Sequence, residues 1–260
     1  MQFSSDLNEH FSSVLHMHQR GFLAEAAEGW RGLISRVPDA AAPWGLLGTA
    51  MIQQGQNKEG IRILEYSLVL DRFNCATLSN LGNALKEIGR SHEAINLLQQ
   101  ALCVNPAFTE ALKNLSATYF AERNWDVAWV LMRRLAELMP FFSEARLSLG
   151  VVKSQLGQLG QAANHFHAAA SLDPAFAEAQ FQLGELAAQR FDFEWAIVFY
   201  DRAISLRPNF SNAYLSRGKA LHGLRKPGEA LESFGRALEN DSGLEAPLAL
   251  ARAKSLGALG

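Results

Sequence analysis

Four polar side chains with complementary hydrogen-bonding chemistry lie close together in the first half of the sequence. They are Asn80, Asn83, Lys113 and Asn114, and all four fall in predicted helices. A side-chain amide offers a donor and an acceptor together, so it can pair with both groups of a peptide bond. The lysine adds one positive charge that suits a carboxylate. These residue types therefore indicate binding of an extended polypeptide.

Residue patterns typical of catalysis or metal binding are weak. The histidine pairs His16/His18 and His165/His167 are each two residues apart, so on a helix their side chains point about 200° from one another. Zinc sites need three or four convergent ligands. The sequence has no glycine-rich phosphate loop and no nucleophile elbow. We therefore expect no enzymatic activity, no cofactor and no metal.

Composition and charge favour a globular or repeat protein. Of the 260 residues, 48% are hydrophobic and 19% are charged, which excludes a disordered chain. The net charge is −2, with 24 basic and 26 acidic side chains. This balance lacks the basic stripe that non-specific nucleic-acid binding requires, so we expect no nucleic-acid partner.

The first residues and the two cysteines favour a cytoplasmic location. The amino-terminal segment carries Asp6 and Glu9 but no early basic residue, whereas a secretory signal has a basic region followed by an apolar one. No stretch approaches the ~18 apolar residues of a membrane span, so we expect no membrane insertion. Cys75 and Cys103 have no metal-ligand spacing and are interpreted as reduced, packed thiols.

An internal repeat is marked by prolines. Pro106, Pro140, Pro174 and Pro208 are each 34 residues apart, a period typical of helix–turn–helix repeats. With proline set at position 32, the predicted repeats are 7–40, 41–74, 75–108, 109–142, 143–176, 177–210 and 211–244. Residues 1–6 precede them as an extension. Residues 245–260 are predicted to form a capping helix, with Leu248 and Leu250 on its buried face, or the start of an eighth repeat.

Other columns of the repeat support this register. Position 8 is glycine in five repeats, and position 20 is alanine in six. Small residues there let the first helix (helix A) and the second helix (helix B) of a repeat approach closely, while large residues at position 24 fill the space between them. Gly21, Gly55, Gly89 and Gly157 are predicted at the A–B turn, where φ is positive. Ser116 replaces glycine in repeat 109–142, which predicts altered packing there.

Period and columns together resemble the tetratricopeptide-repeat family across residues 7–260. The resemblance implies an all-α, right-handed superhelical solenoid of antiparallel helix pairs, with helix A on the concave face. The segment TLSNLGNALKEIG at residues 77–89 resembles repeats of O-linked N-acetylglucosamine transferases and related bacterial glycosyltransferases. In that family, helix-A asparagines line the inner groove and hold the backbone of an extended substrate. Asn80 and Asn114 match that column.

The family geometry predicts a partner-binding groove along the A helices. Its first zone holds the four polar residues introduced above, and its second zone is more apolar. The second zone consists of Leu147, Val151, Phe181 and Leu215, with Glu185 and Lys219 at its edge, and Gln182 occupies the asparagine column beside it. Glu93, Gln99 and Gln100 are predicted on the opposite, convex face. The interpretation that the same residues are merely solvated or packed between repeats stays open.

Three functions fit these features. The leading hypothesis is a protein-interaction scaffold that binds an extended peptide or helix of a partner protein in the concave groove. The second is a substrate-recruiting region of a larger enzyme, most readily a protein glycosyltransferase. The third is a scaffold that self-associates end to end.

Overall fold

The computed structural model describes residues 5–241, 243, 249, 253 and 255–257, and this part of the chain contains helices and no strands. The A helices are α1 (Ser5–Gln19), α3 (Ala41–Gln53), α5 (Cys75–Glu87), α7 (Thr109–Ala121), α9 (Ser143–Gln155), α11 (Ala177–Gln189) and α13 (Ser211–Gly223). The B helices are α2 (Leu23–Arg36), α4 (Asn57–Leu70), α6 (Ser91–Val104), α8 (Trp125–Leu138), α10 (Leu159–Leu172), α12 (Phe193–Leu206) and α14 (Pro227–Asn240). The predicted all-α fold is confirmed.

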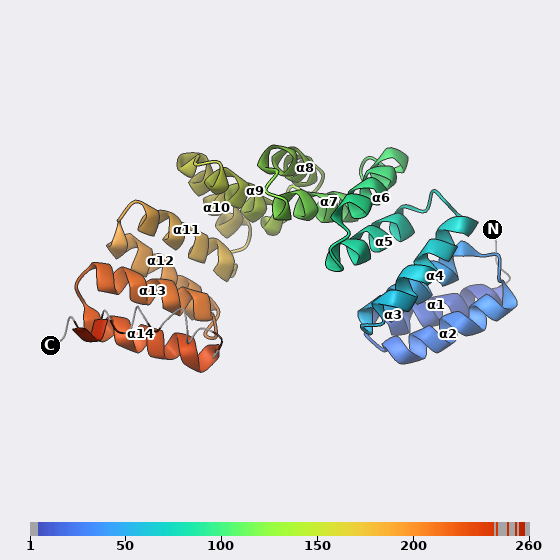
Figure 1. The fold of residues 1–260 in the computed structure, drawn as a ribbon, viewed down its shortest axis with the longest axis horizontal. Helices are drawn as coiled ribbons and strands as arrows, with labels where there is room; N and C mark the ends of the chain where they lie inside the picture. Colours follow the sequence, from blue (N-terminus) through green and yellow to red (C-terminus); the bar gives the residue numbers. More distant parts are fainter. Residues whose placement is uncertain (1–4, 242, 244–248, 250–252, 254, 258–260) are drawn as a thin grey trace. The chain divides into compact units, whose positions relative to one another are not determined.

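The helices form two compact units, Met1–Leu138 and Met139–Gly260. The N-terminal unit contains α1–α8 and the C-terminal unit contains α9–α14. Within each unit, helix A and helix B of a repeat lie antiparallel, and helix B also packs against helix A of the next repeat (Figure 1). Each unit is therefore a stack of helix pairs that bury their apolar sides against neighbouring pairs.

The A–B turns all use one residue in the left-handed region. Gly21, Gly55, Gly89 and Gly157 have φ of 84°, 80°, 81° and 73°, as the sequence predicted. The equivalent residues of the other three repeats adopt the same conformation without glycine. They are Arg123, Phe191 and Arg225, with φ of 59°, 60° and 58°. The turn geometry is thus common to all seven repeats, and three of them accept a strained residue to keep it.

Close approach of the two helices in a repeat depends on the glycine at position 8. A Cβ added at Gly184 would lie 2.5 Å from Cε1 of Tyr200, which is fully buried in α12. At Gly48 an added Cβ would meet Leu64 at 2.8 Å and the carbonyl oxygen of Gly60 at 2.9 Å. The large residue at position 24 therefore fills the space that the glycine leaves, as the columns predicted.

Helix B ends at position 30 even where proline is absent. Proline follows two residues after the end of α6, α10 and α12, yet α4 also ends at Leu70, where Arg72 takes the place of proline. In that turn the backbone N–H of Phe73 donates to Asp71 Oδ1 at 3.2 Å, and Asn74 Oδ1 accepts from the N–H of Thr77 at 3.0 Å. Local side-chain hydrogen bonds therefore stabilise the turn that proline favours elsewhere.

Repeat 109–142 keeps the helix pair but changes its contact. Ser116 is fully buried, and its hydroxyl donates to the carbonyl oxygen of Lys113 at 2.8 Å. The residue at position 24 is Met132, a flexible side chain where the other repeats have leucine or an aromatic ring. Serine thus fits at position 8 because its hydroxyl donates a hydrogen bond to a backbone carbonyl of its own helix.

The predicted capping segment, residues 245–260, lies mostly outside the described residues, and both Leu248 and Leu250 do so. Within its described part, Ser255–Gly257 are helical. Ser255 is fully buried, and its Oγ lies 3.0 Å from Nδ1 of His222 on α13. This serine therefore covers part of the last A helix.

Candidate functional site

Two asparagines on the A helices of the N-terminal unit connect neighbouring repeats. Asn80 on α5 donates from Nδ2 to Thr49 Oγ1 on α3 at 2.9 Å. Asn114 on α7 donates from Nδ2 to Ser79 Oγ on α5 at 3.1 Å. Both asparagines are half-buried. Each amide is therefore held by the preceding repeat.

The anchored amides leave their carbonyl oxygens available. Among the described residues, neither Oδ1 of Asn80 nor Oδ1 of Asn114 accepts a hydrogen bond from the protein, and neither is a buried unsatisfied atom. Thr49 uses its own hydrogen to bond the carbonyl oxygen of Gly45 at 2.8 Å, so it can only accept from Asn80. This fixes the amide of Asn80 with its Oδ1 reached by solvent.

The other two residues of the first zone are engaged within their own helices. Asn83 Oδ1 accepts from Nζ of Lys86 at 3.0 Å. Lys113 Nζ forms an ion pair with Glu110 at 2.9 Å. Exposed pairs of this kind contribute little stability, so a carboxylate of a partner could replace Glu110 at small cost. Glu110 therefore partly neutralises the charge of Lys113, which the sequence analysis assigned to a carboxylate of the partner.

The apolar second zone lies in the C-terminal unit and is half-buried. Leu147 and Val151 pack against the cluster around Phe166 and Leu183. The ring of Phe181 lies 5.0 Å from that of Phe210, centroid to centroid. The other three members differ: Leu215 packs against the cluster of Phe234 and Ala237, Gln182 is half-buried, and Lys219 is exposed. The apolar members therefore contribute to packing between helices, and only part of each side chain faces solvent.

A buried tyrosine next to this zone was missed from the sequence. Tyr200 on α12 donates from its hydroxyl to Glu185 Oε1 on α11 at 2.7 Å. Burial, and then the charge of Glu185, raise the pKa of the Tyr200 phenol well above its ordinary value. The phenol is therefore a fixed neutral donor. The sequence signal is the tyrosine at position 24 opposite Gly184, where the repeat columns predict only a large side chain that fills the core.

One histidine of the two pairs, His18, has a structural role. Trp30 Nε1–H donates to His18 Nδ1 at 3.3 Å, so His18 carries its proton on Nε2 and donates it to Gln53 Oε1 at 2.9 Å. Burial lowers the pKa of the His165 imidazole, which favours its neutral form. In the part of the chain that the structure describes, no three His, Cys, Asp or Glu side chains are placed to hold a metal ion.

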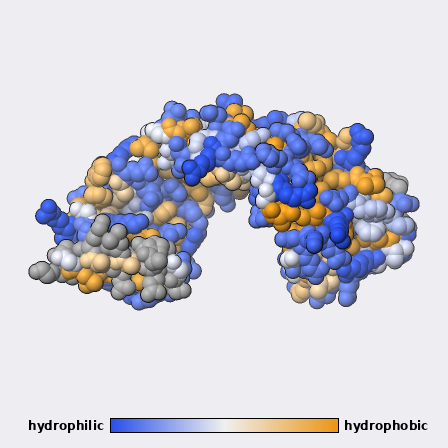
Figure 2. Space-filling view, viewed as in Figure 1, coloured by the Kyte–Doolittle hydropathy of each residue, from blue (hydrophilic) through white to orange (hydrophobic). Residues whose placement is uncertain are grey.

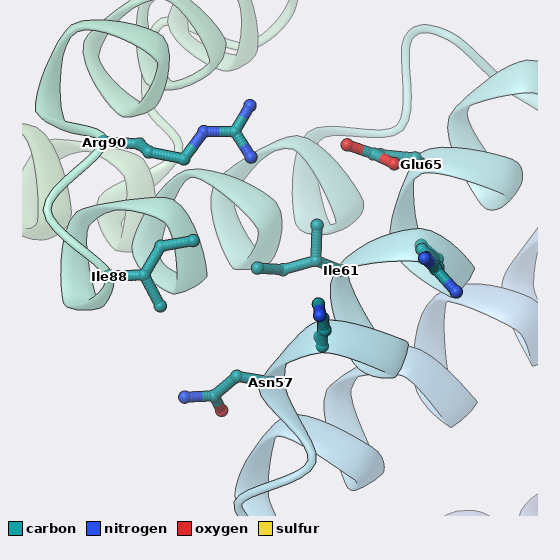
Figure 3. Close-up of a pocket in the computed structure, with 7 residues that line it drawn as sticks. Asn57, Ile61, Glu65, Ile88 and Arg90 are labelled. Carbon is teal, nitrogen blue, oxygen red and sulfur yellow. The ribbon is translucent and has the colours of Figure 1, made fainter.

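Two cavities lie on the B-helix side of repeats 41–74 and 75–108. The first, about 450 Å³, is formed by α4 and the turn between α5 and α6 (Figure 3). It is lined by Asn57, Lys58, Ile61, Arg62, Glu65, Ile88 and Arg90. The second, about 380 Å³, is lined by Glu65, Leu68, Leu81, Leu85, Glu93, Asn96, Leu97 and Gln100. Glu65 lines both, so the cavities are neighbours along α4.

These cavities change the role of two residues predicted on the convex face. Glu93 and Gln100 line the second cavity, and Gln99 donates from Nε2 to the hydroxyl of Tyr119 at 3.3 Å. They are therefore unsuitable as inert controls for a groove experiment. Glu25 and Glu28 on α2 are exposed and form no ion pair within the described residues, so they serve better.

Comparisons with known families identify the repeats. Residues 77–110 and residues 147–211 each match a family model described as tetratricopeptide repeat. The chain thus contains tetratricopeptide repeats in both units, and its fold is a tetratricopeptide-repeat solenoid. A comparison with curated protein sequences finds no significant match. No helix within the described residues is long and apolar enough to cross a membrane.

Solved structures with the same fold cover most of the chain. A tetratricopeptide repeat protein from Parabacteroides merdae is 19% identical, with a TM-score of 0.72 over 96% of this chain and 98% of that one. MamA is 25% identical, with a TM-score of 0.55 over 66% of this chain and 94% of that one. YrrB, described as a TPR protein with an unusual peptide-binding site, is 22% identical, with a TM-score of 0.60 over 72% and 96%.

Proposed function

We propose that this protein is a non-enzymatic interaction scaffold that binds an extended segment of a partner protein along the A helices of its N-terminal unit. Tetratricopeptide-repeat folds are typical of such scaffolds. The observation that carries the proposal is the pair of anchored amides, Asn80 and Asn114, one repeat apart. Lys113 stands beside Asn114 and would approach a carboxylate of the partner.

The bonds between repeats favour binding because they fix the acceptors in advance. The amide of Asn80 is already oriented by Thr49, so little side-chain entropy is lost when its Oδ1 accepts a peptide N–H. Asn114 presents a second acceptor on the next repeat, held by Ser79. An extended peptide that crosses both A helices would therefore meet fixed acceptors on consecutive repeats, which suits recognition of backbone with little dependence on side chains.

The test is selection of random peptides displayed on phage against the purified chain, followed by fluorescence-anisotropy titration of the selected peptides. Each amide–peptide hydrogen bond contributes about 0.5–1.5 kcal/mol net. The double change Asn80→Ala and Asn114→Ala should therefore weaken binding by about 5- to 150-fold, or about 1–3 kcal/mol. The matched control is Glu25→Ala with Glu28→Ala on α2, which should leave the affinity unchanged.

A thermal melt separates lost binding from lost folding, since the asparagines also bond the preceding repeat. Thr49→Val removes the anchor of Asn80 but keeps its carbonyl oxygen, so it should weaken binding less than Asn80→Ala does. Selected peptides that bind the double asparagine variant as well as they bind the natural chain would contradict the proposal.

A second candidate function is recruitment of protein substrates for a glycosyltransferase. Its support is the sequence resemblance of residues 77–89 to O-linked N-acetylglucosamine transferase repeats, in which Asn80 and Asn114 fall in the groove column. A peptide that binds through Asn80 and Asn114 should then be glycosylated when it is fused to a reporter in the native cell. A reporter that stays unmodified would contradict the glycosyltransferase hypothesis and leave the scaffold hypothesis as the remaining one. Self-association, the third hypothesis, is tested by solution mass against protein concentration.

A further inference from the structure

We propose a second docking site, on the B-helix side of repeats 41–74 and 75–108, that takes an acidic amphipathic helix of a partner protein. The site consists of the two cavities along α4, here named the α4 groove. It lies within the N-terminal unit and uses none of the residues assigned to the A-helix face. Its argument is therefore independent of the proposed function.

The floor of the α4 groove is apolar. Ile61, Leu81 and Leu85 belong to one hydrophobic cluster, and each also reaches a cavity wall. Ile88, at the end of α5, is 44% exposed and faces Ile61 across the first cavity (Figure 3). Figure 2 shows hydrophobic surface gathered over α4 and the end of α5. Core side chains that are open to a cavity are typical of binding sites.

The rim of the α4 groove carries two cations without ion-pair partners among the described residues, beside the carboxylate of Glu65. Lys58 and Arg62 lie one turn apart on α4, both exposed, and neither forms an ion pair or side-chain hydrogen bond within the described residues. Arg90, by contrast, is held by two hydrogen bonds of 2.6 Å to Glu93. The hydrogen bonds lower the pKa of Glu93 and raise that of Arg90, so both stay charged.

With that pair neutralised, the charge of the rim is decided by three residues. Lys58 and Arg62 are positive, and Glu65 is negative. A partner that places a carboxylate at this end of the groove would pair with the two cations, whereas a basic partner would be repelled. Charge complementarity thus selects an acidic segment.

The length of the groove fits a helix. The lining residues of α4 run from Asn57 to Leu68, a rise of roughly 16 Å at 1.5 Å per residue. An amphipathic helix binds a groove through apolar side chains at positions i, i+4 and i+7, which all lie on one face of the helix. The two cavities along this length of α4 could receive such side chains. Each cavity also falls within the roughly 300–1,000 Å³ of ligand-binding pockets.

The probe for this site is a pair of displayed peptide libraries with the same leucine positions at i, i+4 and i+7. One library has acidic residues at the remaining positions and the other has basic residues. Selection against the full chain should enrich the acidic library over the basic one by at least about tenfold. Equal enrichment, or enrichment of the basic library, overturns the proposal.

Substitutions then show which surface of the protein the selected acidic peptides bind. The charge reversal Lys58→Glu with Arg62→Glu should weaken their binding by about tenfold or more. Ile88→Ser should also weaken it, and because Ile88 is a half-exposed turn residue, the fold should tolerate this change. Glu25→Lys with Glu28→Lys on α2 is the matched control and should not weaken binding.

The outcomes distinguish this proposal from the proposed function. Acidic peptides that lose affinity in Asn80→Ala with Asn114→Ala, but not in the charge reversal or in Ile88→Ser, occupy the A-helix face and overturn the α4-groove proposal alone. A concentration-dependent dimer that Ile88→Ser abolishes would identify the occupant as a second copy of this chain, which also overturns the proposal of an acidic partner helix.

Discussion

At the scale of single residues, the A–B turn shows how a backbone requirement outweighs side-chain identity. Arg123, Phe191 and Arg225 hold a left-handed φ that glycine adopts in the other four repeats. The left-handed conformation costs a non-glycine residue about 1–2 kcal/mol. Glycine, however, costs about 0.4–1 kcal/mol through the entropy of the unfolded chain. The balance favours glycine, so these three turns store a small strain.

Replacement of the strained residue should therefore stabilise the protein. Arg123→Gly should raise the free energy of unfolding by about 0.5–1 kcal/mol, measured by urea denaturation. Phe191→Gly should gain less, because it also loses the edge contact of its ring with Phe193, 6.1 Å between centroids, and such contacts contribute about 0.5–1.5 kcal/mol.

The reverse change is the matched control for the turn. A Cβ at Gly89 would meet nothing within 4 Å, so Gly89→Ala tests the backbone alone. It should destabilise the protein by about 0.5–1 kcal/mol. If Arg123→Gly destabilises the chain, the arginine side chain makes a contribution larger than the strain.

At the scale of elements, the helix pairs were predictable because their determinants are local in sequence. The glycine of the turn and the small residues at positions 8 and 20 recur every 34 residues, so one register placed the helices. The side chains that touch across the pair follow from the same register, as Gly184 and Tyr200 show. Hydrogen bonds between repeats were not predictable in this way. Asn80 reaches position 9 of the preceding repeat and Asn114 reaches position 5, so no single column contains their partners.

The helix-pair contact makes a prediction about Gly184. An added Cβ would lie 2.5 Å from Tyr200, and overpacking of a core costs about 1–3 kcal/mol. Alanine gains about 1 kcal/mol of helix propensity over glycine, so Gly184→Ala should still destabilise the protein, by up to about 2 kcal/mol. The control is Gly235→Ala in α14, where a Cβ meets nothing within 4 Å. That change should stabilise the protein by about 0.5–1 kcal/mol, and the same sign for both would contradict the packing argument.

At the scale of the whole molecule, the candidate sites were only partly predictable. Family geometry predicted which helices present Asn80 and Asn114, but the α4 groove has no signature in the repeat columns. It depends on how side chains of neighbouring repeats fill the space between them: Ile61 lies in α4, whereas Ile88 and Arg90 lie in the turn between α5 and α6. The shape of the cavity between two repeats depends on the combined volumes of several side chains that are far apart in sequence. A repeat register describes one position at a time, so it does not predict that shape.

The stacked architecture makes a last prediction, because contacts in a repeat protein are mostly between neighbours. A destabilised repeat should therefore weaken the helices beside it and leave distant repeats unchanged. In Gly184→Ala, hydrogen exchange followed by mass spectrometry should show faster exchange in α11 and α12, and to a smaller extent in α10 and α13, which pack against them. Exchange in α1–α4 should match that of the natural chain. Faster exchange by an equal factor in every helix would show that the chain unfolds as one cooperative unit, and the nearest-neighbour description would then fail for this protein.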